Sequence, residues 1–100
     1  MTDNERQTGR TFRMVLEAAM LASDGFPVYV VMNTEEDARW AATERGWMLC
    51  KGFALRLSPT VYTFPNGGFL HFMGAPADPE AFRIAASREA ARVFHDHTVK

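Results

Sequence analysis

The sequence predicts a small layered α/β domain, and its 100 residues fit one domain spanning 1–100. An unbroken apolar run at 28–32 is typical of a strand buried on both faces. Segments with apolar residues at helical spacing lie on either side of it. Asn66-Gly67 separates two β-rich runs, which indicates a hairpin. The predicted order of elements is α-β-α-β-β-β-α.

The first helix is expected from about Arg10 to Ser23, with Thr8 as its cap and Asp24-Gly25 as its end. Its apolar residues at helical spacing are Phe12, Val15, Leu16, Ala19 and Met20. Further apolar residues leave only a narrow polar stripe, so this helix is expected to be central in the domain.

The central strand, 28–32, is rich in β-branched residues. Asn33 and Thr34 then offer caps to a second helix, whose first turn is acidic and which Gly46 is expected to end.

After Gly46, the spacing of apolar residues changes from a helical pattern to the alternation that is typical of strands. Apolar and polar residues alternate over 53–58, and the hairpin 60–73 is expected to turn tightly through Asn66-Gly67. Asp78-Pro79 begins the last helix. That helix is expected to be built on Phe82, Ala86, Ala90, Val93 and Phe94.

Composition and net charge disfavour several classes of function. A net charge of −1 gives no global field for nucleic acid or anionic membranes, so nucleic-acid binding is disfavoured. Cys50 is the only cysteine, and no apolar run approaches the roughly 20 residues that span a bilayer. The polar start is not a secretory signal. A soluble protein of a reducing cytoplasm is therefore expected.

The stretch "NERQTGRTFR" has part of the pattern of a phosphate-binding loop. Gly9 and Thr11 fit that pattern, but Asn4 replaces its first glycine and Arg10 its lysine. The residues before Gly9 are too few and too polar for the strand that should lead into the loop. Two interpretations stay open: a helix start with solvated arginines, and a retained anion or nucleotide site that includes Arg13.

The segment "TGRTFRMVLEAAMLASDGFPVYVVMN" resembles the first helix and second strand of P-loop ATPases, and small phage-encoded proteins that start with TGRT-x-R. "FPNGGFLHFMGAPADPEAFR" is similar to the hairpin segment of phage terminase large subunits. The resemblance covers about two thirds of the chain through short motifs. It implies that Gly9, Arg10 and Thr11 stand where phosphate and magnesium are held, and Asp96 where the Walker B aspartate sits. No glutamate follows Asp96, so no hydrolysis is expected.

Other chemistry-bearing residues have ordinary interpretations. His95 and His97 flank Asp96 in a spacing compatible with a metal, but solvent-facing histidines are the favoured interpretation, and neither metal nor cofactor is expected. His71 is expected to point out of its hairpin face. Cys50 is expected to be buried rather than reactive.

An interaction surface is predicted around Trp40 and Trp47, with Arg39 and Arg45. Trp40 lies off the alanine face of its helix, and exposed tryptophans are typical interface anchors, although they also cover the edges of cores. Basic residues gather here, but neighbouring acids dilute their field. A protein partner is therefore favoured over nucleic acid.

The resemblance and the surface together predict a non-catalytic phage accessory or host-takeover protein. It is expected to bind a host or phage protein complex in the host cytoplasm, for example to inhibit a host defence complex. The alternative is a nucleotide- or nucleic-acid-binding accessory, of DNA-packaging or helicase-like type, that retains an anion site at the start of the first helix.

Overall fold

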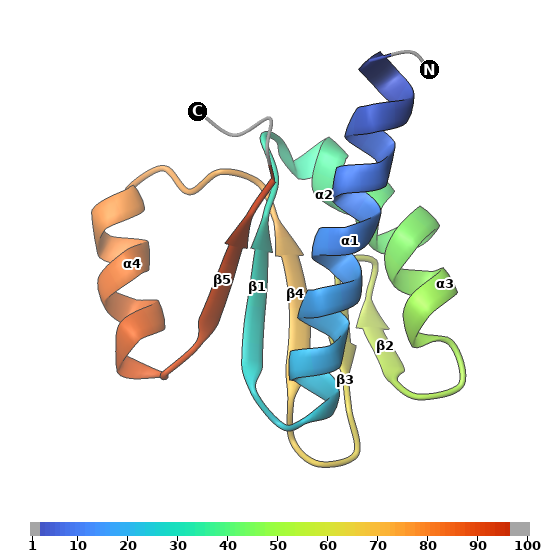
Figure 1. Cartoon of the computed structure of the whole chain (residues 1–100). Coiled ribbons are helices and arrows are strands. Elements are labelled where there is room, and N and C mark those ends of the chain that lie inside the picture. Colours follow the sequence, from blue (N-terminus) through green and yellow to red (C-terminus); the bar gives the residue numbers. More distant parts are fainter. Residues whose placement is uncertain (1–2, 97–100) are drawn as a thin grey trace.

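The computed structural model describes residues 3–96, and the side chains of residues 11–96. It has a five-stranded mixed sheet with helices on both faces, which confirms the α/β class (Figure 1). The elements in chain order are α1 (Asp3–Ser23), β1 (Pro27–Val31), α2 (Glu35–Ala41), the π-helical turn η1 (Ala42–Gly46), α3 (Trp47–Cys50), β2 (Leu55–Ser58), β3 (Val61–Thr63), β4 (Phe69–Met73), α4 (Pro79–Arg88) and β5 (Arg92–His95).

The sheet has the strand order β2-β3-β4-β1-β5. β1 runs parallel to both of its neighbours, β4 and β5, whereas β2, β3 and β4 form an antiparallel meander. The strand predicted at 28–32 is therefore an interior strand, as expected, with its bounds shifted by one residue.

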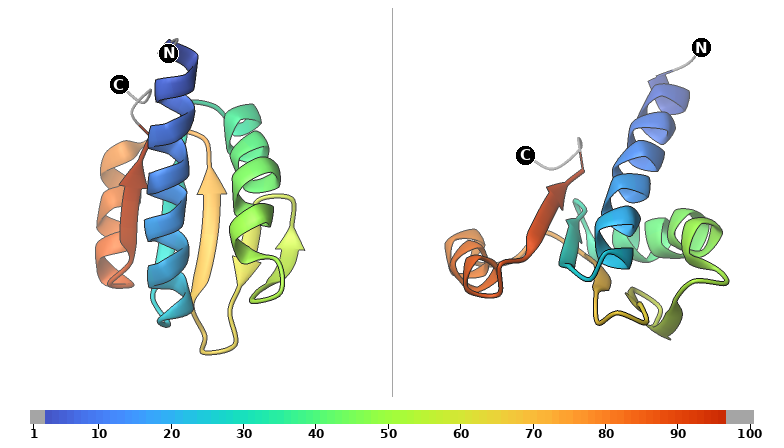
Figure 2. Two further views of the ribbon diagram at one scale, coloured as in Figure 1. Left: turned by 45° about the vertical axis from the view of Figure 1, so that its right-hand side comes forward. Right: turned by 60° about the horizontal axis from the view of Figure 1, so that its bottom comes forward.

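The two faces of the sheet are covered by different helices. Val28 and Val30 of β1 are fully buried in the core that α1 covers, together with Phe72 of β4. The alternate residue Tyr29 faces the other way, and its ring centroid lies 5.3 Å from that of Phe82 in α4. Figure 2 shows the same arrangement, with α1 and the α2–α3 segment on one face and α4 on the other.

The first helix is longer than predicted. α1 begins at Asp3 rather than near Arg10, so the cap expected at Thr8 is wrong and that residue lies inside the helix. Residues 3–8 contain no proline or glycine and include good helix formers, so nothing in them stops the helix. Its end at Ser23 is as predicted, and Gly25 follows with a φ of +104°.

The second helix does not end at Gly46. α2, η1 and α3 form one continuous helical segment that reaches Cys50. Gly46 has a helical φ of −61°, and a Cβ there would lie 2.9 Å from Cε2 of Tyr62. This glycine therefore lets the helix pack closely on the sheet, and it does not end the helix. Thr34 is the N-cap, as predicted.

The hairpin 60–73 is confirmed by β3 and β4, which pair in antiparallel register. Its turn is centred one residue earlier than predicted, on Pro65-Asn66, because Gly67 donates its N–H to the Phe64 carbonyl at 3.0 Å. Gly67 has a φ of +93°, which a glycine adopts without strain.

The last helix is shorter than predicted. α4 ends at Arg88, and Ala90 has a φ of +56° that stops the helix. Val93 and Phe94 instead belong to β5, which pairs with β1. A β-branched and an aromatic residue suit a strand, and this pairing satisfies their backbone groups. The chain therefore gains a strand after its last helix.

Candidate protein-binding surface

The α2–η1–α3 segment is held on the sheet by small buried residues. Ala38, Ala41 and Ala42 are fully buried, and Cys50 is also buried at the end of the segment. A helix that buries alanines lies close to its sheet and turns its larger side chains outward. Trp40 lies off the alanine face, as predicted.

The outward side of this segment carries large apolar side chains. The exposed fractions are 46% for Trp40, 49% for Trp47 and 56% for Met48. Tryptophan, methionine and arginine are enriched at protein interfaces. We call this area the tryptophan surface and define it by Arg39, Trp40, Arg45, Trp47 and Met48.

The π-helical turn places a cation on one of the tryptophans. The guanidinium carbon of Arg45 lies 5.6 Å from the ring centroid of Trp40. Residues five apart face different sides of an α-helix but approach each other in a π-helix, whose hydrogen bonds join such residues. Arg39 is exposed beside Trp40. Both arginines predicted for this surface are thus on the same helical segment as the tryptophans.

The π turn is attached to the sheet by a buried phenol. Tyr62 of β3 is 1% exposed and donates its hydroxyl proton to the Ala42 carbonyl at 2.7 Å. Burial raises the pKa of Tyr62, so the phenol keeps its proton at neutral pH.

An arginine adds a second attachment. Arg56 of β2 donates to Oγ1 of Thr43 at 2.9 Å, and its guanidinium carbon lies 5.5 Å from the centroid of the Tyr62 ring. These contacts fix the orientation of the segment that presents the tryptophan surface. The sequence analysis missed them, because no local pattern joins a helical turn to strands that follow it.

The structure brings together two residues of the predicted anion site. Oγ1 of Thr11 donates to Oδ1 of Asp96 at 3.1 Å, and the two residues are 5% and 4% exposed. Asp96 directly follows β5, at the carboxyl end of the parallel strands, where α/β proteins bind ligands. Arg13 is exposed on α1.

The other predicted residues of that site lie inside a helix. Gly9 and Arg10 belong to α1, which begins six residues before Gly9. Interior N–H groups of a helix bond to its own carbonyls, whereas a phosphate loop offers free N–H groups at a helix start. The side chain of Arg10 lies outside the described part of the chain, so anion binding stays a prediction.

The remaining candidates are Cys50, His71 and the histidines that flank Asp96. Burial raises the pKa of Cys50 to about 11, which keeps its thiol protonated. His71 lies on the face of β4 opposite the buried Leu70 and Phe72, and burial lowers its pKa. His97 lies outside the described residues. Within the described chain, no group of three metal-binding side chains gathers.

Comparisons with known proteins give no indication of the function. No family model, curated protein or solved structure matches the chain. Among residues 3–96, no helix has both the length and the apolar composition needed to cross a bilayer.

Proposed function

We propose that this chain is a non-catalytic protein-binding domain that docks its partner through the tryptophan surface. The observation that supports this most is the exposure of Trp40, Trp47 and Met48 on one helical segment. Fully burying one large apolar side chain contributes roughly 1.5–3 kcal/mol. Because Trp40, Trp47 and Met48 are each about half exposed, a partner that covers all three gains roughly half of that energy for each of them.

The attachment of the segment also suits binding. Tyr62 and Arg56 hold the π turn from the sheet, and Arg45 lies against Trp40. A surface that is ordered before binding loses less conformational entropy in the complex.

The local charge favours a protein over a nucleic acid. Acids outnumber arginines in the segment 35–48, whose charged residues are Glu35, Glu36, Asp37, Arg39, Glu44 and Arg45. A nucleic-acid surface needs a net positive field to displace counterions from phosphates, and this segment lacks one.

We further propose that the partner belongs to a host or phage protein complex in the host cytoplasm, and that binding inhibits a host defence complex. This role is supported by the resemblance of "TGRTFR" to the start of small phage proteins, and by the missing lysine and glutamate, which argue against catalysis.

The test is a quantitative affinity purification from the host. Tagged wild-type chain is compared with Trp40→Ala/Trp47→Ala and with Leu55→Ala/Leu57→Ala. The leucines are a matched control because they are 65% and 61% exposed on β2, outside the tryptophan surface.

The proposal expects a protein that co-purifies with the wild type and the leucine variant but not with the tryptophan variant. Thermal unfolding of each variant checks that all are folded. A partner captured equally by folded forms of all three proteins would contradict the proposal.

A second candidate function is nucleotide binding, which the Thr11–Asp96 contact favours. A hydroxyl and a carboxylate side by side are the kind of group that holds a nucleotide-bound Mg²⁺. Titration calorimetry with Mg²⁺-ATP, with Thr11→Val as the variant, tests it. Saturable binding that Thr11→Val abolishes supports this candidate, and no heat at millimolar nucleotide removes it. Hydrolysis is expected in neither case.

A further inference from the structure

The connections of the sheet reverse at two neighbouring strands. β1 and β4 are adjacent and parallel. The chain continues from β1 into α2, on the face that α1 covers, and from β4 into α4, on the opposite face (Figure 2). In open α/β sheets, ligands bind outside the carboxyl ends of the strands, at the point where the connections change face. The topology therefore favours a ligand site at this end of the sheet.

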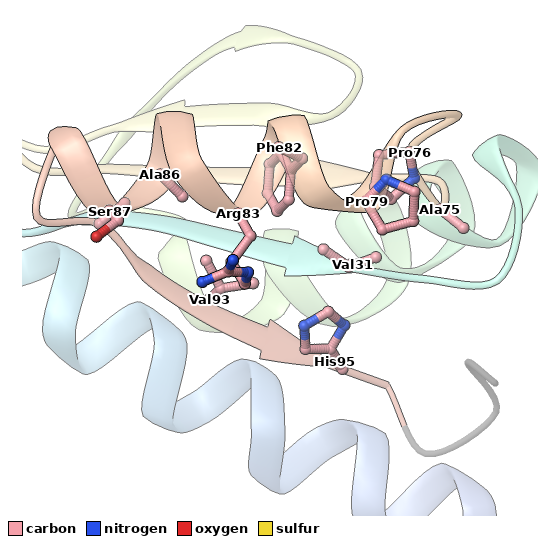
Figure 3. A pocket seen from close by; sticks show the side chains of 11 residues that line it. Val31, Ala75, Pro76, Pro79, Phe82, Arg83, Ala86, Ser87, Val93 and His95 are labelled. Atoms are coloured by element: carbon pink, nitrogen blue, oxygen red, sulfur yellow. The ribbon is translucent and has the colours of Figure 1, made fainter.

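A groove lies at this end, between α4 and the sheet. It has a volume of about 560 Å³, and small-molecule sites in proteins have volumes of about 300–1,000 Å³. Val31 and His95, the last residues of β1 and β5, line the groove. Ala75 and Pro76 line it from the segment that follows β4 (Figure 3). All three parallel strands therefore lead into the groove.

The walls of the groove are largely apolar. Phe82 and Ala86 contribute to them from α4, and Val93 contributes from β5 (Figure 3). Such walls suit the hydrocarbon part of a ligand, because the transfer of apolar surface from water to apolar surroundings is favourable.

The polar side chains of the groove are hydrogen-bond donors. They belong to Arg83, Ser87 and His95, and no carboxylate is among the described residues that line the groove. Arg83 from α4 and His95 from β5 both project into it (Figure 3). The guanidinium carries a permanent positive charge, and the imidazole offers an N–H donor in either tautomer. These two groups are complementary to the two oxygens of a carboxylate.

We propose that the groove binds a small monocarboxylate with an apolar body. The ligand carboxylate lies between Arg83 and His95, and the hydrocarbon part lies along Phe82 and Val93. Charge complementarity selects a carboxylate over an alcohol or an amine. The tryptophan surface is carried by the α2–α3 segment on the other face of the sheet (Figure 2), so the inference does not rest on the proposed function.

Arg83 already has a carboxylate neighbour. A nitrogen of its guanidinium lies 2.5 Å from Oε1 of Glu80, and the two side chains are 70% and 69% exposed. Ion pairs that are this exposed are weak, because water screens them. A ligand carboxylate can therefore replace Glu80 as the partner of Arg83, and removal of the Glu80 carboxylate should strengthen ligand binding.

Titration of the ¹⁵N-labelled full chain with octanoate, followed by amide chemical shifts, tests the site. Saturable shifts are expected at Ala86 and Val93, with a dissociation constant below about 1 mM. 1-Octanol and octylammonium carry the same hydrocarbon chain without the carboxylate, so each should bind about five-fold more weakly or worse.

Three variants in α4 isolate the charge. Arg83→Gln should weaken octanoate binding by about five-fold and leave octanol binding unchanged. Glu80→Gln should strengthen octanoate binding by about two-fold or more. Arg88→Gln is the matched control, because Arg88 is exposed on the same helix and does not line the groove, and it should leave octanoate binding unchanged. Thermal unfolding of each variant checks that it is folded.

The absence of saturable shifts with millimolar octanoate overturns the proposal. So do shifts that centre on another part of the chain, or octanol or octylammonium binding as tight as that of octanoate. An Arg88→Gln variant that weakens octanoate binding as much as Arg83→Gln does also overturns it. If Arg83→Gln unfolds, Glu80→Gln decides, and octanoate binding that is unchanged or weaker in that variant contradicts the proposal.

Discussion

Replacing Gly46 by alanine sets two effects of opposite sign against each other. Gly46 has helical dihedral angles inside the continuous α2–η1–α3 segment. In an exposed helix interior, glycine to alanine stabilises by about 1 kcal/mol, because glycine loses more backbone entropy on folding. From propensity alone, this substitution should raise stability.

Packing acts against that gain. The new Cβ would lie 2.9 Å from Cε2 of Tyr62 and 3.1 Å from Cε1 of Phe72. Both rings are buried, at 1% and 0% exposed, and their centroids lie 6.4 Å apart in an edge contact, so neither can move aside freely. Overpacking of this kind costs about 1–3 kcal/mol. The cost exceeds the gain, and we expect a net destabilisation of about 1 kcal/mol.

Urea unfolding of Gly46→Ala measures the balance. Glu44→Ala is the control, because Glu44 is exposed in the same π turn and its replacement should change stability by no more than about 0.5 kcal/mol. An increase in the free energy of unfolding of Gly46→Ala would refute the close packing of η1 on Tyr62 and Phe72.

Three further predictions concern single groups. Because the buried Cys50 has a pKa of about 11, its alkylation at about pH 8 should be far slower in the folded chain than in urea, and equal rates by mass spectrometry would argue against its burial. Burial lowers the pKa of His71 below its ordinary 6.5. Below about pH 6.5 the unfolded chain therefore binds a proton at His71 more readily than the folded chain does, and the free energy of unfolding falls as the pH falls. His71→Gln should reduce the loss of stability between about pH 7.5 and about pH 5.5 in urea titrations, and an unchanged pH dependence would speak against this role. Thr34→Ala removes the side-chain oxygen that accepts the Asp37 N–H at 3.0 Å and should lower the free energy of unfolding by about 1 kcal/mol, whereas no change would mean that the cap is unimportant.

Local chemistry in the sequence predicted much of the fold. The run at 28–32 indicated an interior strand because β-branched residues pack on both faces of a sheet. Thr34 and Asp78 were predicted as caps, and each accepts a backbone N–H at the start of its helix. The exposure of Trp40 followed from helical spacing against the alanines.

Features that depend on distant contacts were not predictable. The π turn is held by Tyr62, which follows Ala42 by twenty residues and leaves no mark on the local pattern. Val93 and Phe94 fit the apolar spacing of a helix as well as that of a strand, and only their pairing with β1 selects the strand. Thr11 and Asp96 are 85 residues apart, and only the resemblance to P-loop proteins implied a shared site.

The affinity of the partner, once purified, for single variants tests the role of the tryptophan surface most directly. Truncation of a buried tryptophan anchor costs about 2 kcal/mol or more, so Trp40→Ala and Trp47→Ala should each raise the dissociation constant by about thirty-fold. Arg10→Ala and Arg13→Ala should mainly alter association rate and salt dependence. If the folded tryptophan variants bind as tightly as the wild type while the arginine variants lose binding, the tryptophan surface is not the interface and the part of α1 that carries Arg10 and Arg13 takes its place.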